Sequence, residues 1–210
     1  RGLRAEAPSS LIGSGAMEEP RGPELRGERD ELRESLGRIG VWSFALESLT
    51  AAEEREAVAE IESFGYGAIW FPESVESREV FAHAGWILAS TERAIAVSGI
   101  ANIWAESGWR MLTEAYQGRF VLGVGVRHAG SVARRGGTYE RPYTAMRDYL
   151  DSMSRAPSSA PENDWTPRLV LAALGPRMLE LAAERAHGVH PYFVPVEHTA
   201  FARQRLGPGP

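Results

Sequence analysis

The fold is decided by one segment of the chain, RFVLGVGVRH at residues 119–128. The segment is apolar, contains β-branched residues and glycines, and closes with two polar side chains, Arg127 and His128. A run of this kind is typical of a buried parallel strand. Because ligands of α/β proteins bind at the carboxyl ends of the strands, its polar end is expected to face a site.

Apolar strands alternate with amphipathic helices on both sides of this segment. In addition to the opening one, the sequence predicts strands at residues 39–43, 68–71, 94–100 and 168–174, and one that ends at 190–193. Six strand–helix units in strict alternation indicate a parallel sheet with helices outside it. The fold class is therefore α/β, and two architectures compete: an open doubly wound sheet, and an incomplete (β/α)₈ barrel of the TIM type.

Several helix ends are marked by their capping residues. Thr50 and Glu53 form a capping-box pattern at the start of one helix, and Gly65 is a typical stop at its end. Gly175-Pro176 opens a later helix, with proline at its favoured first-turn position.

The first 36 residues are rich in Gly, Pro, Ser, Arg and Glu and have few large apolar side chains. Such a segment buries too little surface to offset its ordering entropy, so we expect a disordered tail at 1–36, of which residues 28–36 could form a frayed helix. Residues 37–210 are expected to form a single barrel domain that lacks its last units.

The composition excludes several classes of protein. The 210 residues are 43% hydrophobic and 24% charged, with a formal net charge of −5 and no cysteine. Disulfides and thiolate chemistry are therefore excluded, and the acidic balance disfavours nucleic acid and anionic membranes as partners. No apolar run reaches the roughly 18 residues that a membrane span needs. A cytoplasmic protein with a small-molecule substrate is the expectation.

Polar and aromatic residues collect at the expected carboxyl ends of the strands. They are Trp42, Ser43, Glu73, Ser98, Gly99, Asn102, Gly125, Arg127, His128, Gly175, Pro176, His190 and Tyr192. Because the strand bodies are apolar, this contrast is what a ligand site requires.

Each of these residues has a functional and a structural interpretation. Gly125 either lets a flat ring approach the backbone or only allows close packing. His128 and His190 could donate protons, bind a cofactor or serve as satisfied structural histidines. Glu73 could act as a general base or be an ordinary loop glutamate. The residues show no metal-ligand spacing, so no metal is expected.

Several sequence blocks together resemble one family, the bacterial luciferase-like oxidoreductases, in the subgroup that uses the deazaflavin coenzyme F420 in place of FMN. The resemblance covers residues 36 to 210, and its blocks are LGRIGVWS (36–43), GYGAIW (65–70), SGIANIW (98–104), GRFVLGVG (118–125) with His128, AALGPRML (172–179) and HGVHPYF (187–193). In place of a small serine expected before His128, this chain has Arg127.

The resemblance implies a (β/α)₈ barrel with the cofactor ring at the carboxyl ends of the strands, and a cis peptide in the region of residues 98–100. It places His128 beside the ring or the substrate, and the catalytic candidates are His128 and, from its position after the second strand, Glu73. The residues expected to bind the cofactor are Trp42, Ser98, Gly99, Asn102, Gly125, Gly175, Pro176, His190 and Tyr192.

The resulting hypothesis is an oxidoreductase that uses coenzyme F420 for hydride transfer with a small organic substrate. The alternatives are an FMN-dependent luciferase-like monooxygenase, and a non-catalytic truncated fragment of such an enzyme. A homodimer is the expected assembly.

Overall fold

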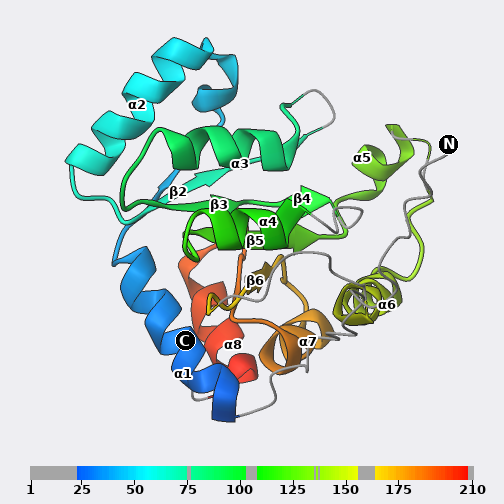
Figure 1. Ribbon diagram of the computed structural model, residues 1–210. Helices are drawn as coiled ribbons and strands as arrows, with labels where there is room; N and C mark the ends of the chain where they lie inside the picture. Colours follow the sequence, from blue (N-terminus) through cyan, green and yellow to red (C-terminus); the bar gives the residue numbers. More distant parts are fainter. Residues whose placement is uncertain are drawn as a thin grey trace, which may run out of the picture.

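A computed structural model of the chain describes residues 23–74, 77–102, 108–134, 136, 138–155 and 164–207. Figure 1 shows a curled sheet with helices packed around it. The strands are β1 (Val41–Trp42), β2 (Ala68–Phe71), β3 (Ile95–Ser98), β4 (Ala101–Asn102), β5 (Phe120–Gly125), β6 (Arg168–Leu171) and β7 (Gly188–Val189).

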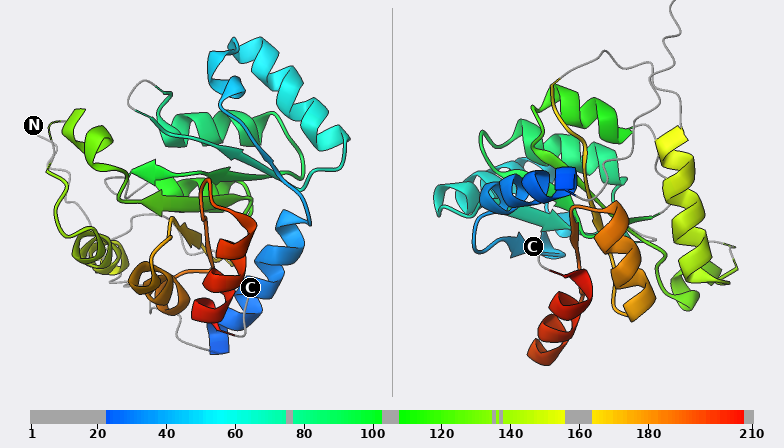
Figure 2. Two further views of the ribbon diagram at one scale, coloured as in Figure 1. Left: turned by 180° about the vertical axis from the view of Figure 1, so that it is seen from behind. Right: turned by 90° about the horizontal axis from the view of Figure 1, so that it is seen from below.

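The strand order decides between the two architectures. The order is β1-β2-β3-β5-β6-β7, with β4 beside β5, and every pairing is parallel. A doubly wound sheet would reverse its strand order at a switch point, whereas a barrel adds each new strand on the same side. The sequential order and the curl of the sheet in Figure 2 confirm an incomplete (β/α)₈ barrel.

The helices follow the predicted alternation. They are α1 (Pro23–Leu36), α2 (Ala51–Ser63), α3 (Val80–Ala89), α4 (Gly108–Ala115), α5 (Ala129–Arg134), α6 (Pro142–Arg155), α7 (Pro176–Arg185) and α8 (Val196–Leu206), with a 3₁₀ turn, η1, at Ala45–Ser48. The Thr50–Glu53 capping box is present, and Pro176 stands in the first turn of α7, as predicted. Gly65 adopts a φ of 87°, the left-handed conformation that ends a helix after α2.

Both faces of the sheet are buried, because side chains alternate along each strand. Ile69, Phe71 and Leu122 face the helices on the outside of the barrel, where they pack with Val58 and Ile87. The intervening residues form a second cluster on the inner face: Ala68, Ile95, Val97, Val121 and Val170.

Helix α1 corrects the expectation of a disordered tail that reaches Leu36. Leu32 is 2% exposed and packs on the inner-face cluster, with Leu36 beside it. In Figure 1, α1 lies on the opposite side of β2 and β3 from α2 and α3. The segment has few apolar residues, but Leu32 and Leu36 are placed where they cover apolar side chains of the strands, and Leu25 is buried as well. Tertiary packing therefore orders a helix whose composition alone does not.

Replacing Leu32 by alanine is expected to lower the free energy of unfolding by about 3 kcal/mol, because it leaves a cavity between α1 and the inner face of the sheet. The measurement is urea unfolding followed by circular dichroism. Ser35→Ala is the matched control, since Ser35 is exposed on the same helix. Equal stability of the Leu32 variant and wild type would contradict the packing of α1.

Candidate functional site

A cavity of about 630 Å³ lies at the carboxyl ends of the strands. Its size is that of a cofactor or small-molecule site. Its lining is mostly apolar and aromatic, with the polar groups coming from the strand ends and from the start of α7. This is the edge of the sheet at which the sequence predicts a ligand.

Eight of the eleven predicted site residues line this cavity. They are Trp42, Glu73, Gly99, His128, Gly175, Pro176, His190 and Tyr192. They come from the ends of β1, β2, β3, β5, β6 and β7, so residues spread over about 150 positions of sequence converge on one space. The convergence follows from the parallel sheet, since all strands end on the same side.

Ser98 and Gly125, two of the residues predicted to bind a cofactor, do not line the cavity. The Ser98 hydroxyl donates to the Gly123 carbonyl at 3.0 Å and accepts from the Gly123 amide at 2.9 Å. A Cβ on Gly125 would stand 1.9 Å from Cδ1 of Ile100. Gly125 therefore makes room for Ile100, which lines the cavity itself. The side chain of Asn102 lies outside the described part of the structure.

Gly99 shapes the floor of the cavity. The Gly99–Ile100 peptide is cis, as the resemblance implied. A Cβ on Gly99 would stand 2.7 Å from Nε1 of Trp42, a distance too short for a real contact. Glycine therefore allows the indole ring to lie against the backbone. Nε1 of Trp42 is buried and has no hydrogen-bond partner among the described residues.

Aromatic rings form one wall of the cavity. The ring of Trp42 lies 5.3 Å from that of Tyr192, and His190 stacks on Trp70 with ring centroids 5.1 Å apart. Burial lowers the pKa of His190, so its imidazole stays neutral at pH values at which an exposed histidine would already be protonated. Its Nε2 is buried and makes no hydrogen bond within the described residues. A neutral imidazole of this kind is suited to hydrogen bonding with a ligand.

Arg127 introduces a positive charge where a small residue is expected. It adopts a φ of 63°, and its guanidinium donates to the Ile100 carbonyl at 3.1 Å. Its Nη2 lies 3.6 Å from a carboxylate oxygen of Glu73, and both side chains are only 15% exposed. The predicted base Glu73 is thus half of an ion pair that joins the ends of β2 and β5.

Sequence reasoning missed several of the residues that line the cavity, Phe44 and Tyr143 among them. Phe44 follows β1 and contacts Trp42 edge-on, with ring centroids 4.6 Å apart. Tyr143 lies in the first turn of α6 under the guanidinium of Arg177, 4.4 Å from the ring centroid. A search of the first turns of the helices, as well as the strand ends, would have found Tyr143 and Arg177.

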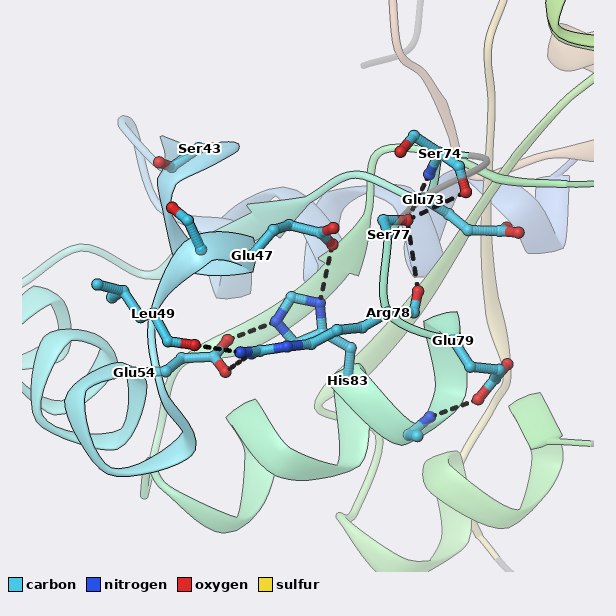
Figure 3. Close-up of polar contacts among 12 residues, drawn as sticks. Ser43, Glu47, Leu49, Glu54, Glu73, Ser74, Ser77, Arg78, Glu79 and His83 are labelled. Carbon is cyan, nitrogen blue, oxygen red and sulfur yellow. Dashed lines mark hydrogen bonds and ion pairs between the residues drawn. The ribbon is translucent and has the colours of Figure 1, made fainter.

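A buried cluster of charged groups supports the loop after β2. Glu54, on α2, is fully buried and contacts both Arg78 and His83, and Figure 3 shows the three side chains converging between α2 and α3. The other ring nitrogen of His83 lies 3.4 Å from Glu47. Burial raises the pKa of Glu47, against the opposing effect of His83. Arg78 also donates to the Leu49 carbonyl, so the cluster fixes the end of the β2–α3 loop, which also contains Glu73, against the outer helices.

Comparisons with known proteins place this arrangement in one family. The family model for luciferase-like monooxygenases matches residues 35–207. The chain therefore belongs to the luciferase-like monooxygenase family. A search of curated proteins found no match.

Solved structures share the fold. The coenzyme F420-dependent tetrahydromethanopterin reductase of Methanopyrus kandleri aligns with a TM-score of 0.55 and 15% identity, over 72% of this chain and 54% of that one. The monooxygenase RslO1 of Streptomyces bottropensis aligns with a TM-score of 0.65 and 16% identity, over 81% and 64%. An F420-dependent secondary alcohol dehydrogenase, solved with an F420–acetone adduct, aligns with a TM-score of 0.59 and 17% identity, over 73% and 58%.

The chain spans between 54% and 64% of the length of these three structures. Among the described residues, no helix is both long enough and apolar enough to cross a bilayer.

Replacing Arg78 by methionine is expected to lower the free energy of unfolding by about 3 kcal/mol, because it removes one partner of the buried Glu54 carboxylate. Arg93→Met is the control: the Arg93 side chain is 72% exposed and its ion pairs with Glu62 and Glu92 are as long as 4.0 Å and 3.7 Å, so a change below about 0.5 kcal/mol is expected. Chemical unfolding of both variants measures the difference. Similar values for the two would show that the cluster contributes no more than a surface pair.

Proposed function

We propose that the cavity binds the ring of a deazaflavin or flavin cofactor, with coenzyme F420 as the first candidate and FMN as the second, and that the chain is an oxidoreductase acting on a small organic substrate. The observation that carries the proposal is the cavity itself: an aromatic, largely apolar space with two buried nitrogens that lack partners among the described residues, Nε1 of Trp42 and Nε2 of His190.

These features fit a flat heteroaromatic ring with polar edges. Trp42 and Tyr192 offer aromatic surface, and a ligand that supplies hydrogen-bond partners for Trp42 and His190 would remove the cost of burying their nitrogens. The start of α7 at Gly175–Pro176 also opens on the cavity, and a helix start favours a negative group such as a phosphate. Trp42, His190 and Tyr192 would hold the ring, and the helix start at Gly175–Pro176 would hold its anionic tail.

When bound, such a cofactor supplies hydride transfer, a reaction that protein side chains cannot perform. The residues of the chain then bind and orient the substrate and keep water out with the aromatic wall. His128 lines the cavity and is exposed to solvent, so its imidazole can exchange a proton between solvent and the substrate. Arg127 and Glu73 place one positive and one negative group beside it and would orient a polar substrate.

The names of the structural neighbours support F420 as the first candidate. Two of the three neighbours described above are F420-dependent enzymes, and the third is a monooxygenase. The FMN-dependent alternative therefore has support as well. A chain that keeps the fold without binding a cofactor is the third alternative.

Titration of the purified chain with F420 and with FMN, followed by cofactor fluorescence, tests the proposal. We expect saturable binding of one of them. Gly99→Ala is expected to weaken that binding at least about tenfold, because the added methyl group pushes Trp42 from its place. Gly130→Ala is the control, since nothing lies within 4 Å of a Cβ there. Absence of binding by wild type to either cofactor would overturn the proposal.

A further inference from the structure

The cavity wall formed by His190 and Tyr192 belongs to a segment with little support of its own. It follows β7, a strand of two residues, which pairs with β6 only through Val170↔Gly188 and Leu171↔Val189. In the described part of the sheet, β7 is an edge with no strand on its other side. Because two residue pairs are too few to fix the position of β7, other contacts must do so.

Those contacts come from α1, at the amino-terminal end of the barrel. His187, directly before β7, is 5% exposed. Its amide donates to the Leu169 carbonyl at 2.8 Å, and its Nδ1 accepts from the Leu169 amide at 3.0 Å. Its Nε2 lies 2.9 Å from the carboxylate of Glu28 on α1. Because an amide can only donate, Nδ1 must be unprotonated. Nε2 therefore carries the proton and donates to Glu28.

Arg29, the next residue of α1, holds the chain on the other side of His187. Its guanidinium donates to the Ala183 carbonyl at 2.7 Å and to the Ala186 carbonyl at 2.8 Å. These are carbonyls at the carboxyl end of α7, where unpaired acceptors and the helix dipole both favour a cation. Two adjacent residues of α1 thus fix the turn from α7 into β7.

We propose that Glu28 and Arg29 are positioning residues, which set the register of β7 from the far end of the barrel and thereby place His190 and Tyr192 in the cavity wall. From His187 to His190 the chain covers roughly 10 Å of extended backbone. His190 is itself joined to β6, since its amide donates to the Leu171 carbonyl at 2.8 Å. With His187 fixed in place, the ring of His190 therefore remains stacked on Trp70. The proposal concerns the cavity of the proposed function, but its test needs no cofactor.

The same contacts make the segment sensitive to acid. Burial lowers the pKa of His187, against the opposing effect of the Glu28 hydrogen bond, and Arg168 and Arg29 lower it further. The fold thus favours the neutral ring, and the stability from His187 is complete above the unfolded pKa of about 6.5 and is lost as the pH falls below it. Protonation of Nδ1 of His187 would place its N–H directly against the amide N–H of Leu169, and the hydrogen bond between them would be lost.

Hydrogen–deuterium exchange of the full chain, without cofactor, tests the proposal. In Glu28→Leu, the amides of residues 186–192 are expected to exchange on the order of tenfold faster than in wild type, since a hydrogen bond to a charged group is lost. Arg29→Met is expected to act in the same direction. Glu28→Gln keeps an acceptor for His187 and is expected to restore most of the protection.

The amides of α2 are the internal control, because α2 has no contact with Glu28 or Arg29 in the described hydrogen bonds. Unchanged exchange at 186–192 in both Glu28→Leu and Arg29→Met would overturn the proposal. So would an equal rise in α2, which would mean a general loss of stability. Faster exchange at 186–192 in a chain that binds neither F420 nor FMN would keep the positioning role and reject the proposed function.

Discussion

The structure depends on one constraint: a parallel sheet must bury both of its faces. The outer face is covered by helices of the alternating units, in the usual manner of a barrel. The inner face is covered by its own side chains together with Leu32 and Leu36 of α1. The edges β1 and β7 are not joined by backbone pairing in the described sheet. Side chains connect their carboxyl ends instead, through the rings of Trp42 and Tyr192.

The site inherits its properties from this construction. Parallel strands bring the residues of distant units to one edge, and the aromatic side chains that connect β1 with the end of β7 also form the cavity wall. The wall holds two buried nitrogens, in Trp42 and His190, that the described residues leave without partners. An apolar space with a few unsatisfied polar groups has the general character of a ligand-binding pocket.

Sequence patterns predicted the elements well because they are local. The Thr50–Glu53 capping box and the apolar run of β5 each follow from a few neighbouring residues. The strand-end rule also placed eight of its eleven predicted site residues in the cavity lining. Ser98 and Gly125 also stand at strand ends but do not line the cavity. Ser98 is hydrogen-bonded to Gly123, and the space beside Gly125 is filled by Ile100, and no local sequence pattern predicts these neighbours. The rule missed Tyr143, which reaches the cavity from a helix start.

By itself, the sequence determined the parallel α/β architecture, the family and the edge of the sheet at which the cavity lies, because periodicity, turn residues and strand polarity depend on short stretches of chain. Only the tertiary structure decided the role of residues 23–36, which are polar enough to predict disorder. Leu32 orders that segment by meeting Val97 and Val121, far along the chain. The pairing of Glu28 with His187 and of Glu73 with Arg127 was decided in the same way. Contacts between residues this distant depend on how the barrel curls, and no local pattern contains that information.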